Sequence, residues 1–240
     1  MRFQFIVPMV IGISLLLLLN CEDKQTSKQK ENAIAKDSVV IETKPQKHIS
    51  SELITKSPRL TDANAMEFFL EYEKEHKEDK VRITTDFGTI DILLYDKTKF
   101  HRANFIYLTK RKYYDGTQFY RVVKNFVIQG GSSDGVDLYK KRRKIGKYLL
   151  PPDTKRGYTH KRGAISMPSS DIENAYKLAS PFQFFIIHRP GGAAYLDKDY
   201  TVFGEVISGM DVVDKINAIE TDKGDWPLEN VYIRKVEIIE

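Results

Sequence analysis

Short stretches in which apolar and polar residues alternate dominate the chain from Val81 onward. Residues 81–85 and 90–95 alternate on either side of a turn at 86–88, a pattern that predicts an antiparallel hairpin. Apolar residues at helical spacing instead predict helices over 101–111 and 210–218. Further strands are predicted at 118–123, 127–129, 163–167, 183–187, 201–206 and 232–239. Many short strands beside two helices indicate a mainly β fold, a closed barrel with helices capping its ends.

The N-terminus follows a different pattern. Arg2 precedes an almost entirely apolar run over 5–19, which is shorter than the about 20 apolar residues that a membrane span needs. The run is typical of a signal peptide, and it is followed directly by Asn20 and Cys21, the only cysteine of the chain. We therefore interpret 1–20 as a signal peptide that resembles those of bacterial lipoproteins, with Cys21 as the lipidation site. The alternatives are an ordinary signal peptide with an incidental cysteine and an uncleaved signal anchor.

Residues 22–67 contain no Phe, Tyr or Trp and are rich in Lys, Glu, Ser, Thr and Gln. Such a composition buries too little apolar surface to offset the entropy of ordering, so we expect 21–63 to be a disordered tether. Short strands at 39–41 and 53–54 are the alternative. Asn64 and Glu67 have the spacing of a capping box and precede apolar residues at helical spacing. We predict a helical extension over 64–80, followed by one domain over 81–240.

The chain carries a net charge of +5, and its sharpest charge run is Lys140-Lys141-Arg142-Arg143-Lys144, with Lys147 beyond. Runs of this kind are more often solvated loops than binding sites, although a patch for anionic lipid or nucleic acid is an alternative. No aromatic residues are interleaved with the run for base stacking, so no nucleic-acid partner is expected. The histidines are scattered without metal-ligand spacing, and no phosphate-binding loop is present. We therefore expect neither a metal nor a cofactor.

Three sequence blocks point to a specific family. The first is Phe119-Tyr-Arg-Val-Val-Lys-Asn-Phe-Val-Ile-Gln-Gly-Gly131, the second is Gln183-Phe-Phe-Ile186, and the third is Val202-Phe-Gly204. In this order and at this spacing they resemble the cyclophilin family of peptidyl-prolyl isomerases, from about Val81 to the C-terminus. The resemblance implies a closed antiparallel eight-stranded barrel capped by two helices, acting as a monomer on proline-containing polypeptides.

Rotation about an Xaa-Pro bond needs no nucleophile or metal, because the barrier of about 18–20 kcal/mol comes from amide resonance. It needs a hole for the proline ring and a donor that stabilises the twisted amide. Arg121 is the candidate donor, since a guanidinium is always charged and presents several N–H groups. Taken alone, an arginine in a strand is more often a surface residue.

The resemblance implies further site residues. Phe126 and Gln129 join Arg121 as the catalytic group, with Phe126 in the proline pocket and Gln129 as the carbonyl-binding group. The implied substrate-binding residues are Val127, Gln183, Phe185, Tyr195, Leu196 and Tyr200.

Strand alternation separates these residues from the core. Val127 and Gln129 share one face of their strand, and Gln183 and Phe185 share one face of theirs. Ile128 and Phe184 point to the opposite side and are expected in the core. The two glutamines need hydrogen-bond partners if they are buried, and they could bond each other.

The sequence departs from the family pattern at several places. Tyr120 and Tyr200 stand where histidines are common, and Tyr195 stands where a tryptophan is common. We expect these tyrosines to alter drug affinity and rate, because a phenol keeps a ring face and a polar edge. The loop over 168–182 is longer than in compact members. It is either a harmless insertion or a change in preference for residues before proline.

The sequence thus predicts a membrane-anchored isomerase that assists folding of exported proteins at a bacterial envelope. A second hypothesis is a binding module that holds proline-containing segments without catalysis. A third is a surface lipoprotein that engages its partners through the basic run at 140–147.

Overall fold

The computed structural model describes residues 57–169 and 174–240. The predictions for the signal peptide over 1–20, for Cys21 and for most of the tether lie outside these residues. Each strand predicted from alternation overlaps a strand of the structure. These strands are β2 (Lys80–Thr85), β3 (Gly88–Leu94), β4 (Thr117–Val123), β5 (Val127–Ser132), β7 (Ala164–Ser166), β8 (Phe184–Ile187), β9 (Val202–Ser208) and β10 (Tyr232–Ile238).

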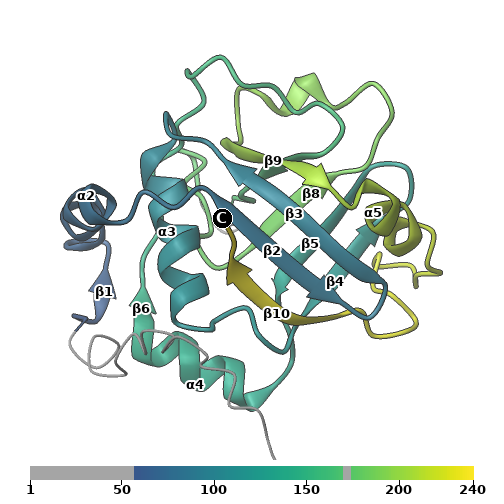
Figure 1. Ribbon diagram of the computed structural model, residues 1–240, viewed down its shortest axis with the longest axis horizontal. Helices are drawn as coiled ribbons and strands as arrows, with labels where there is room; N and C mark the ends of the chain where they lie inside the picture. Colours follow the sequence, from purple (N-terminus) through teal and green to yellow (C-terminus); the bar gives the residue numbers. More distant parts are fainter. Residues whose placement is uncertain (1–56, 170–173) are drawn as a thin grey trace, which may run out of the picture. The chain divides into compact units, whose positions relative to one another are not determined.

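These strands close into a barrel in the order β10-β2-β3-β9-β7-β8-β5-β4 (Figure 1). Every neighbouring pair is antiparallel. Closure leaves no unpaired sheet edge, so the barrel satisfies its own backbone hydrogen bonds. The predicted closed eight-stranded antiparallel barrel is therefore confirmed.

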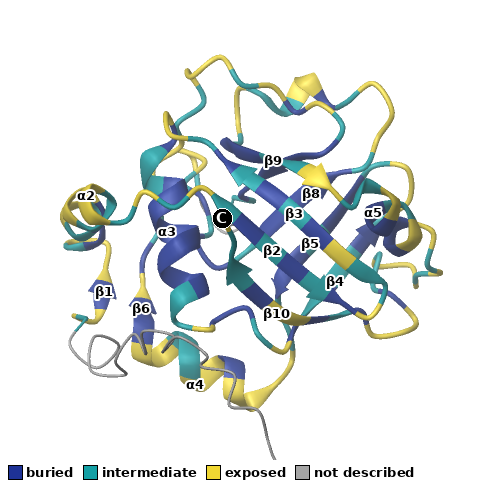
Figure 2. Ribbon diagram, in the orientation of Figure 1, coloured by how far each residue is buried: buried dark blue, intermediate teal, exposed yellow. Residues whose placement is uncertain are grey.

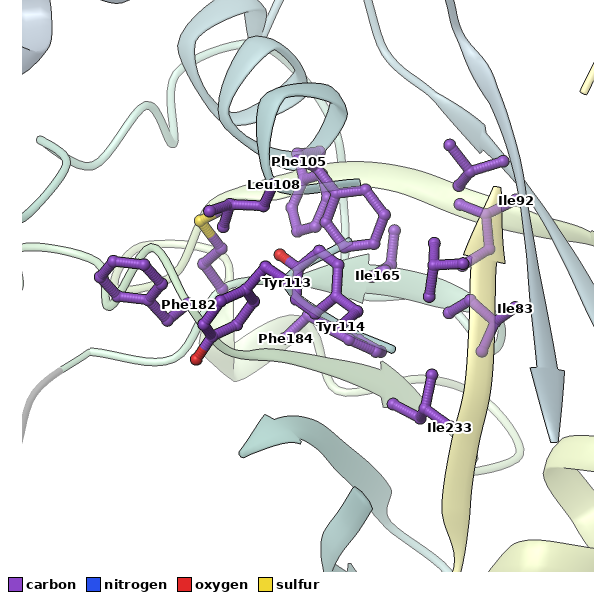
Figure 3. Packing of buried hydrophobic residues seen from close by; sticks show 14 of the residues in the cluster. Ile83, Ile92, Phe105, Leu108, Tyr113, Tyr114, Ile165, Phe182, Phe184 and Ile233 are labelled. Carbon is purple, nitrogen blue, oxygen red and sulfur yellow. The ribbon is translucent and has the colours of Figure 1, made fainter. Parts of the chain in front are cut away.

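The two predicted helices are α3 (Lys99–Lys110) and α5 (Met210–Asn217), which lie on opposite sides of the barrel in Figure 1. The ring of Phe105 on α3 stacks on Tyr114 at a centroid distance of 4.8 Å and meets Phe184 of β8 edge-on at 5.6 Å. Figure 3 shows these rings packed with isoleucines of the barrel strands. Burial is greatest along the strands and through the middle of α3, where every residue from His101 to Thr109 is buried (Figure 2). This core fixes the strands that carry the site.

Order begins earlier than predicted. The short strand β1 (Leu60–Thr61) pairs in parallel with β6 (Gly146–Lys147), and Leu60 is fully buried. A Cβ at Gly146 would lie 1.9 Å from the carbonyl oxygen of Leu60, so only glycine allows this pairing. Residues 57–63 were assigned to the tether because they lack aromatic residues, but they are part of the ordered domain.

Helix α2 (Ala65–Glu75) matches the predicted helical extension, but the expected capping box does not form. The Asn64 side chain turns back and accepts a hydrogen bond from the Thr61 backbone N–H at 2.8 Å. On its inner side, α2 buries Phe69, whose ring meets Tyr107 of α3 edge-on at 5.8 Å. The helix is therefore packed against α3.

The basic run was expected to be a loop, but it forms α4 (Val136–Ile145). Leu138 and Ile145 are buried and fix one side of this helix against the domain. Leu138 and Ile145 are seven residues apart, or about two helical turns, and therefore lie on the same side of α4. With mostly charged residues between them, these two positions were too few to indicate an amphipathic helix in the sequence.

Candidate active site

A cleft of about 640 Å³ collects most of the predicted site residues. Its lining consists of Tyr120, Arg121, Phe126, Val127, Gln129, Pro168, Ser169, Ser180, Gln183, Phe185, Leu196 and Tyr200. Cys21 lies outside the described residues, and Tyr195 is not part of the lining. Every other residue predicted for catalysis or substrate binding lines this cleft.

Strand register aligns three of these side chains. Arg121 on β4 is paired with Gln129 on β5, and Gln129 is paired with Phe185 on β8. Directly opposed residues in neighbouring antiparallel strands project to the same face of the sheet. A cation, an amide and an aromatic ring therefore stand side by side across three strands.

The prediction about strand faces is confirmed. Ile128 and Phe184 are fully buried and belong to the main core cluster. Val127 and Phe185 belong to a second apolar cluster, which also contains the partly buried side chains of Phe126, Leu196 and Tyr200. This second cluster forms the apolar side of the cleft.

A β-bulge brings Tyr120 into the cleft as well. The register between β4 and β5 shifts between Phe119 and Arg121, so that Tyr120 is an extra residue in the ladder. Phe119 and Val122 point into the core and are fully buried, whereas both residues between them line the cleft. Simple alternation sends consecutive residues to opposite faces, so it could not place Tyr120 beside Arg121 in the cleft. Only the family resemblance connected Tyr120 with drug affinity and rate.

The Tyr120 hydroxyl connects the two glutamines. Gln129 Nε2 donates a hydrogen bond to the hydroxyl oxygen, and the hydroxyl donates to Gln183 Oε1 at 3.0 Å. The sequence left open a direct bond between the two amides, and in the structure the phenol stands between them. This chain of hydrogen bonds orients both amide groups at the cleft.

Arg121 has a carboxylate partner that the sequence did not reveal. Its Nη2 atom donates a hydrogen bond to Asp225 Oδ2 at 3.0 Å, and both side chains are about 40% exposed (40% and 38%). The carbonyl of Asp225 accepts from the backbone N–H of Val122 at 2.8 Å, so the loop holding Asp225 is joined to β4. Asp225 has a φ of 64°, in the left-handed region. Arg121 thus lines the cleft while this carboxylate holds one end of its guanidinium group.

The same loop supports Tyr120. Asp222 Oδ1 accepts hydrogen bonds from the backbone N–H groups of Gly224 and Trp226, which closes the loop on itself. The Trp226 ring lies 5.9 Å from the ring of Tyr120. One loop thus contacts the two neighbouring polar residues of β4.

Phe126 is held by a tight turn between β4 and β5. Asn125 has a φ of 58°, and its backbone N–H donates to Asn217 Oδ1 on α5 at 2.8 Å. The buried Asn217 also donates from Nδ2 to the carbonyl of Val123 at 2.9 Å. The turn is therefore fixed from the outside by α5, and Phe126 is positioned at the cleft.

Phe185 is sandwiched between polar aromatic groups. Its ring is stacked on the imidazole of His160 at 6.0 Å and meets Tyr200 edge-on at 5.9 Å. Tyr195 lies outside the cleft: it is 62% exposed and stacks on Phe126 at 6.2 Å. Its predicted role in substrate binding would thus be exerted through Phe126.

The long loop over 168–182 contributes to the rim. Ser180 donates its backbone N–H to the carbonyl of Pro168 at 2.7 Å, and Ala179 exchanges backbone hydrogen bonds with Leu150. Pro168, Ser169 and Ser180 line the cleft and were not assigned to the site from the sequence. The sequence drew attention to this loop through its length, but nothing in the residue types singled out these three residues.

His160, Asp197 and Ser166 form a hydrogen-bonded series behind Phe185. His160 Nδ1 lies 2.6 Å from Asp197 Oδ1, and Nε2 lies 3.1 Å from Ser166 Oγ. Burial lowers the pKa of His160, although Asp197 opposes the effect. His160 and Ser166 are completely buried, and the serine hydroxyl donates to the carbonyl of Thr201. The series resembles a hydrolase triad in its residue types but has no access for a substrate.

The described residues offer no group of three His, Cys, Asp or Glu side chains placed to hold a metal ion. Within residues 57–169 and 174–240, no helix combines the length and the apolar character needed to cross a membrane.

Comparisons with known proteins agree with this geometry. Residues 80–238 match the family model described as cyclophilin type peptidyl-prolyl cis-trans isomerase. The peptidyl-prolyl cis-trans isomerase cypE of Dictyostelium discoideum is 35% identical over 164 residues, covering 66% of this chain and 96% of that protein. The peptidyl-prolyl cis-trans isomerase-like 2 protein of Rhizopus delemar is 36% identical over 169 residues. This chain spans only 30% of the Rhizopus protein, and the match covers 70% of the chain.

Solved structures give the same result. A crystal structure of a cyclophilin type isomerase from Cryptosporidium parvum has a TM-score of 0.57 and 25% identity, covering 68% of this chain and 98% of that one. A second crystal structure of that protein was determined in the presence of the dipeptide Ala-Pro, with a TM-score of 0.56 and 25% identity, covering 67% of this chain and 99% of that one.

Proposed function

Because the chain belongs to the cyclophilin type peptidyl-prolyl cis-trans isomerase family, we propose that it accelerates rotation about Xaa-Pro bonds in this cleft. The observation that carries the proposal is the row formed by Arg121, Gln129 and Phe185 on neighbouring strands. A proline pocket needs an apolar wall beside a donor and a carbonyl-binding group, and this row supplies all three. The Ala-Pro dipeptide used with the Cryptosporidium relative is the kind of ligand that the cleft would hold.

In this proposal the apolar cluster holds the proline ring while the bond rotates. Phe126, Phe185 and Leu196 contact the ring, and the amide groups of Gln129 and Gln183 hold the flanking backbone. When the amide twists, resonance is lost and the lone pair becomes localised on the proline nitrogen. An N–H group of Arg121 stabilises that nitrogen, so its interaction is stronger in the twisted state than in either planar isomer.

Isomerisation of an Ala-Pro peptide by the fragment 57–240, followed by NMR exchange, tests this activity. The fragment contains the closed barrel and the main core cluster of the described residues. The Cryptosporidium protein, which this chain covers to 98%, corresponds to 68% of this chain. We therefore expect the fragment to fold alone. We expect exchange far faster than the uncatalysed rate. If a folded fragment binds the peptide without accelerating its exchange, the cleft is a binding site for proline-containing segments, which is the second hypothesis.

We also propose that the protein acts on exported proteins at a bacterial envelope, anchored through lipid on Cys21. Support comes from the sequence: an apolar run over 5–19 is followed by Asn20 and then by Cys21, the only cysteine of the chain. A lipid anchor would keep the isomerase near polypeptides that emerge from the export machinery.

The location is tested separately from the activity. The full chain and its Cys21→Ser variant are expressed in a bacterium fed with an alkyne fatty acid, and the label and the membrane fraction are measured. We expect label and membrane association for the natural chain, and loss of the label in the variant. A natural chain that takes up no label would contradict the anchor and leave the isomerase proposal intact.

A further inference from the structure

Helix α4 has an inner side that is bonded to the domain. Leu138 and Ile145 are buried, and Lys141 Nζ donates hydrogen bonds to the carbonyls of Lys112 and Asp115 at 2.8 and 2.9 Å. Arg142 lies 4.9 Å above the ring of Phe182 and donates to the hydroxyl of Tyr113 at 3.1 Å. Lys141 and Arg142 of the basic run thus bind groups of the domain itself.

The outer face of α4, defined here as Val136, Tyr139, Lys140, Arg143 and Lys144, has a different character. At about 100° per residue these positions fall on one side of the helix, opposite the buried residues. Val136 is 69% exposed and Tyr139 is 65% exposed. Arg143 and Lys144 are exposed, and Lys140 makes a surface pair with Asp137 at 3.2 Å in which both side chains are mostly in water. Such a pair contributes little to stability.

Helix α4 lies beside β1 and away from the cleft. The helix ends at Ile145, and the next residue, Gly146, pairs with Leu60 of β1. The strand β1, near the start of the described residues, therefore lies beside the C-terminal end of α4. No residue of α4 lines the cleft, so contact at its outer face leaves the lining of the cleft free.

We propose that the outer face of α4 binds an anionic membrane surface. A row of cations flanking an exposed tyrosine and valine is the composition of helices that lie at the headgroup level, where the phenol and the apolar group enter the interface. Lysine and arginine contribute attraction to anionic lipid within a Debye length. Single-stranded nucleic acid is favoured less, because it is bound through several stacking rings, and this face carries only Tyr139.

Co-sedimentation with lipid vesicles tests this inference without the lipid anchor. The fragment 57–240 is mixed with vesicles of phosphatidylcholine alone or with phosphatidylglycerol added, at low and at physiological salt. We expect binding only to the anionic vesicles, and weaker binding at the higher salt. The triple variant Lys140→Gln, Arg143→Gln and Lys144→Gln should bind about 100-fold more weakly, since each cation contributes roughly fivefold.

A matched control removes three exposed lysines from other elements: Lys74→Gln, Lys215→Gln and Lys235→Gln. It has the same net charge as the α4 variant and should bind like the natural fragment. Tyr139→Ser should also weaken binding, which a purely electrostatic attraction would not explain. Equal loss in both triple variants, no preference for anionic vesicles, or tighter binding to an oligonucleotide than to the vesicles would overturn the proposal. The α4 variant should retain its isomerisation rate, which shows that it is folded.

Discussion

At the scale of single residues, the orientation of Arg121 depends on Asp225. The carboxylate bonds one end of the guanidinium at 3.0 Å, and because the arginine is about 40% exposed, little else restrains it. A long flexible side chain loses rotamer entropy when it is fixed, so an arginine that is already held binds the transition state at a lower entropic cost.

Asp225→Asn should therefore lower kcat/KM about twofold to fivefold, which corresponds to the modest contribution of an exposed ion pair. Its free energy of unfolding should change little for the same reason. NMR exchange on an Ala-Pro peptide measures the first quantity and urea unfolding the second. Asp211→Asn, which removes an exposed pair with Lys215 on α5, is the control. An unchanged rate in Asp225→Asn would mean that the carboxylate does not position Arg121.

Tyr120 is the second residue whose role follows from geometry. Tyr120→Phe keeps the ring but removes the hydroxyl that joins Gln129 and Gln183. A neutral hydrogen bond contributes about 0.5–1.5 kcal/mol, so kcat/KM should fall roughly threefold to tenfold. Tyr176→Phe, at a side chain that is 81% exposed, should have no effect on the same assay. Equal rates for the two variants would show that the amide groups need no bridge.

At the scale of elements, α5 supports the site through one side chain. Asn217 is 2% exposed and bonds the turn that carries Phe126, accepting from Asn125 and donating to Val123. Asn217→Ala leaves these buried backbone groups without partners, which costs about 1–3 kcal/mol of unfolding free energy. We also expect lower isomerase activity, because Phe126 loses its fixed position. Urea unfolding and peptide exchange measure the two effects, with the exposed Asn230→Ala as the control. A stable and fully active Asn217→Ala protein would contradict this account.

Elements also show how far the sequence predicted the fold and the site. Alternation placed every barrel strand, and it separated Gln129 from Ile128 and Phe185 from Phe184 because side-chain period is a local property. The register that pairs Gln129 with Phe185 came only from the structure. It failed at Tyr120, where a bulge adds a residue, and at Asp225, whose partner is 104 residues away in sequence. Nor could composition indicate β1, whose stability comes from pairing with a distant glycine. Each of these differences comes from pairing between segments, which no pattern within a single segment reveals.

At the scale of the whole molecule, stability should depend on pH through His101. This histidine of α3 is fully buried, and both of its ring nitrogens lack hydrogen-bond partners. Burial lowers its pKa from 6.5 to about 3. Between these values the unfolded chain binds a proton that the folded domain does not, so unfolding is favoured as the pH falls below 6.5.

One such proton contributes about 1.4 kcal/mol per pH unit. The unfolding free energy decreases as the pH falls from about 6 to about 4.5, and His101→Leu should make the slope of this decrease smaller by about 1.4 kcal/mol per pH unit. The reason is that leucine cannot titrate. Chemical denaturation at a series of pH values measures the slope. His76→Gln, at a ring that is 28% exposed, should change the slope less. If His101→Leu keeps the natural slope, the buried imidazole is not the source of acid sensitivity.

The proposed isomerisation of Xaa-Pro bonds depends most of all on Arg121. The most direct test compares the fragment 57–240 with its Arg121→Ala variant in NMR exchange on an Ala-Pro peptide. Arg234→Ala is the matched control, because Arg234 also lies on a barrel strand and forms a half-exposed pair with an aspartate.

Arg121→Ala should lose about 100-fold in kcat/KM, or about 2.7 kcal/mol of transition-state stabilisation, while it remains folded. Arg234→Ala should keep the natural rate. If a folded Arg121→Ala fragment exchanges the peptide as fast as the natural fragment, Arg121 does not stabilise the transition state.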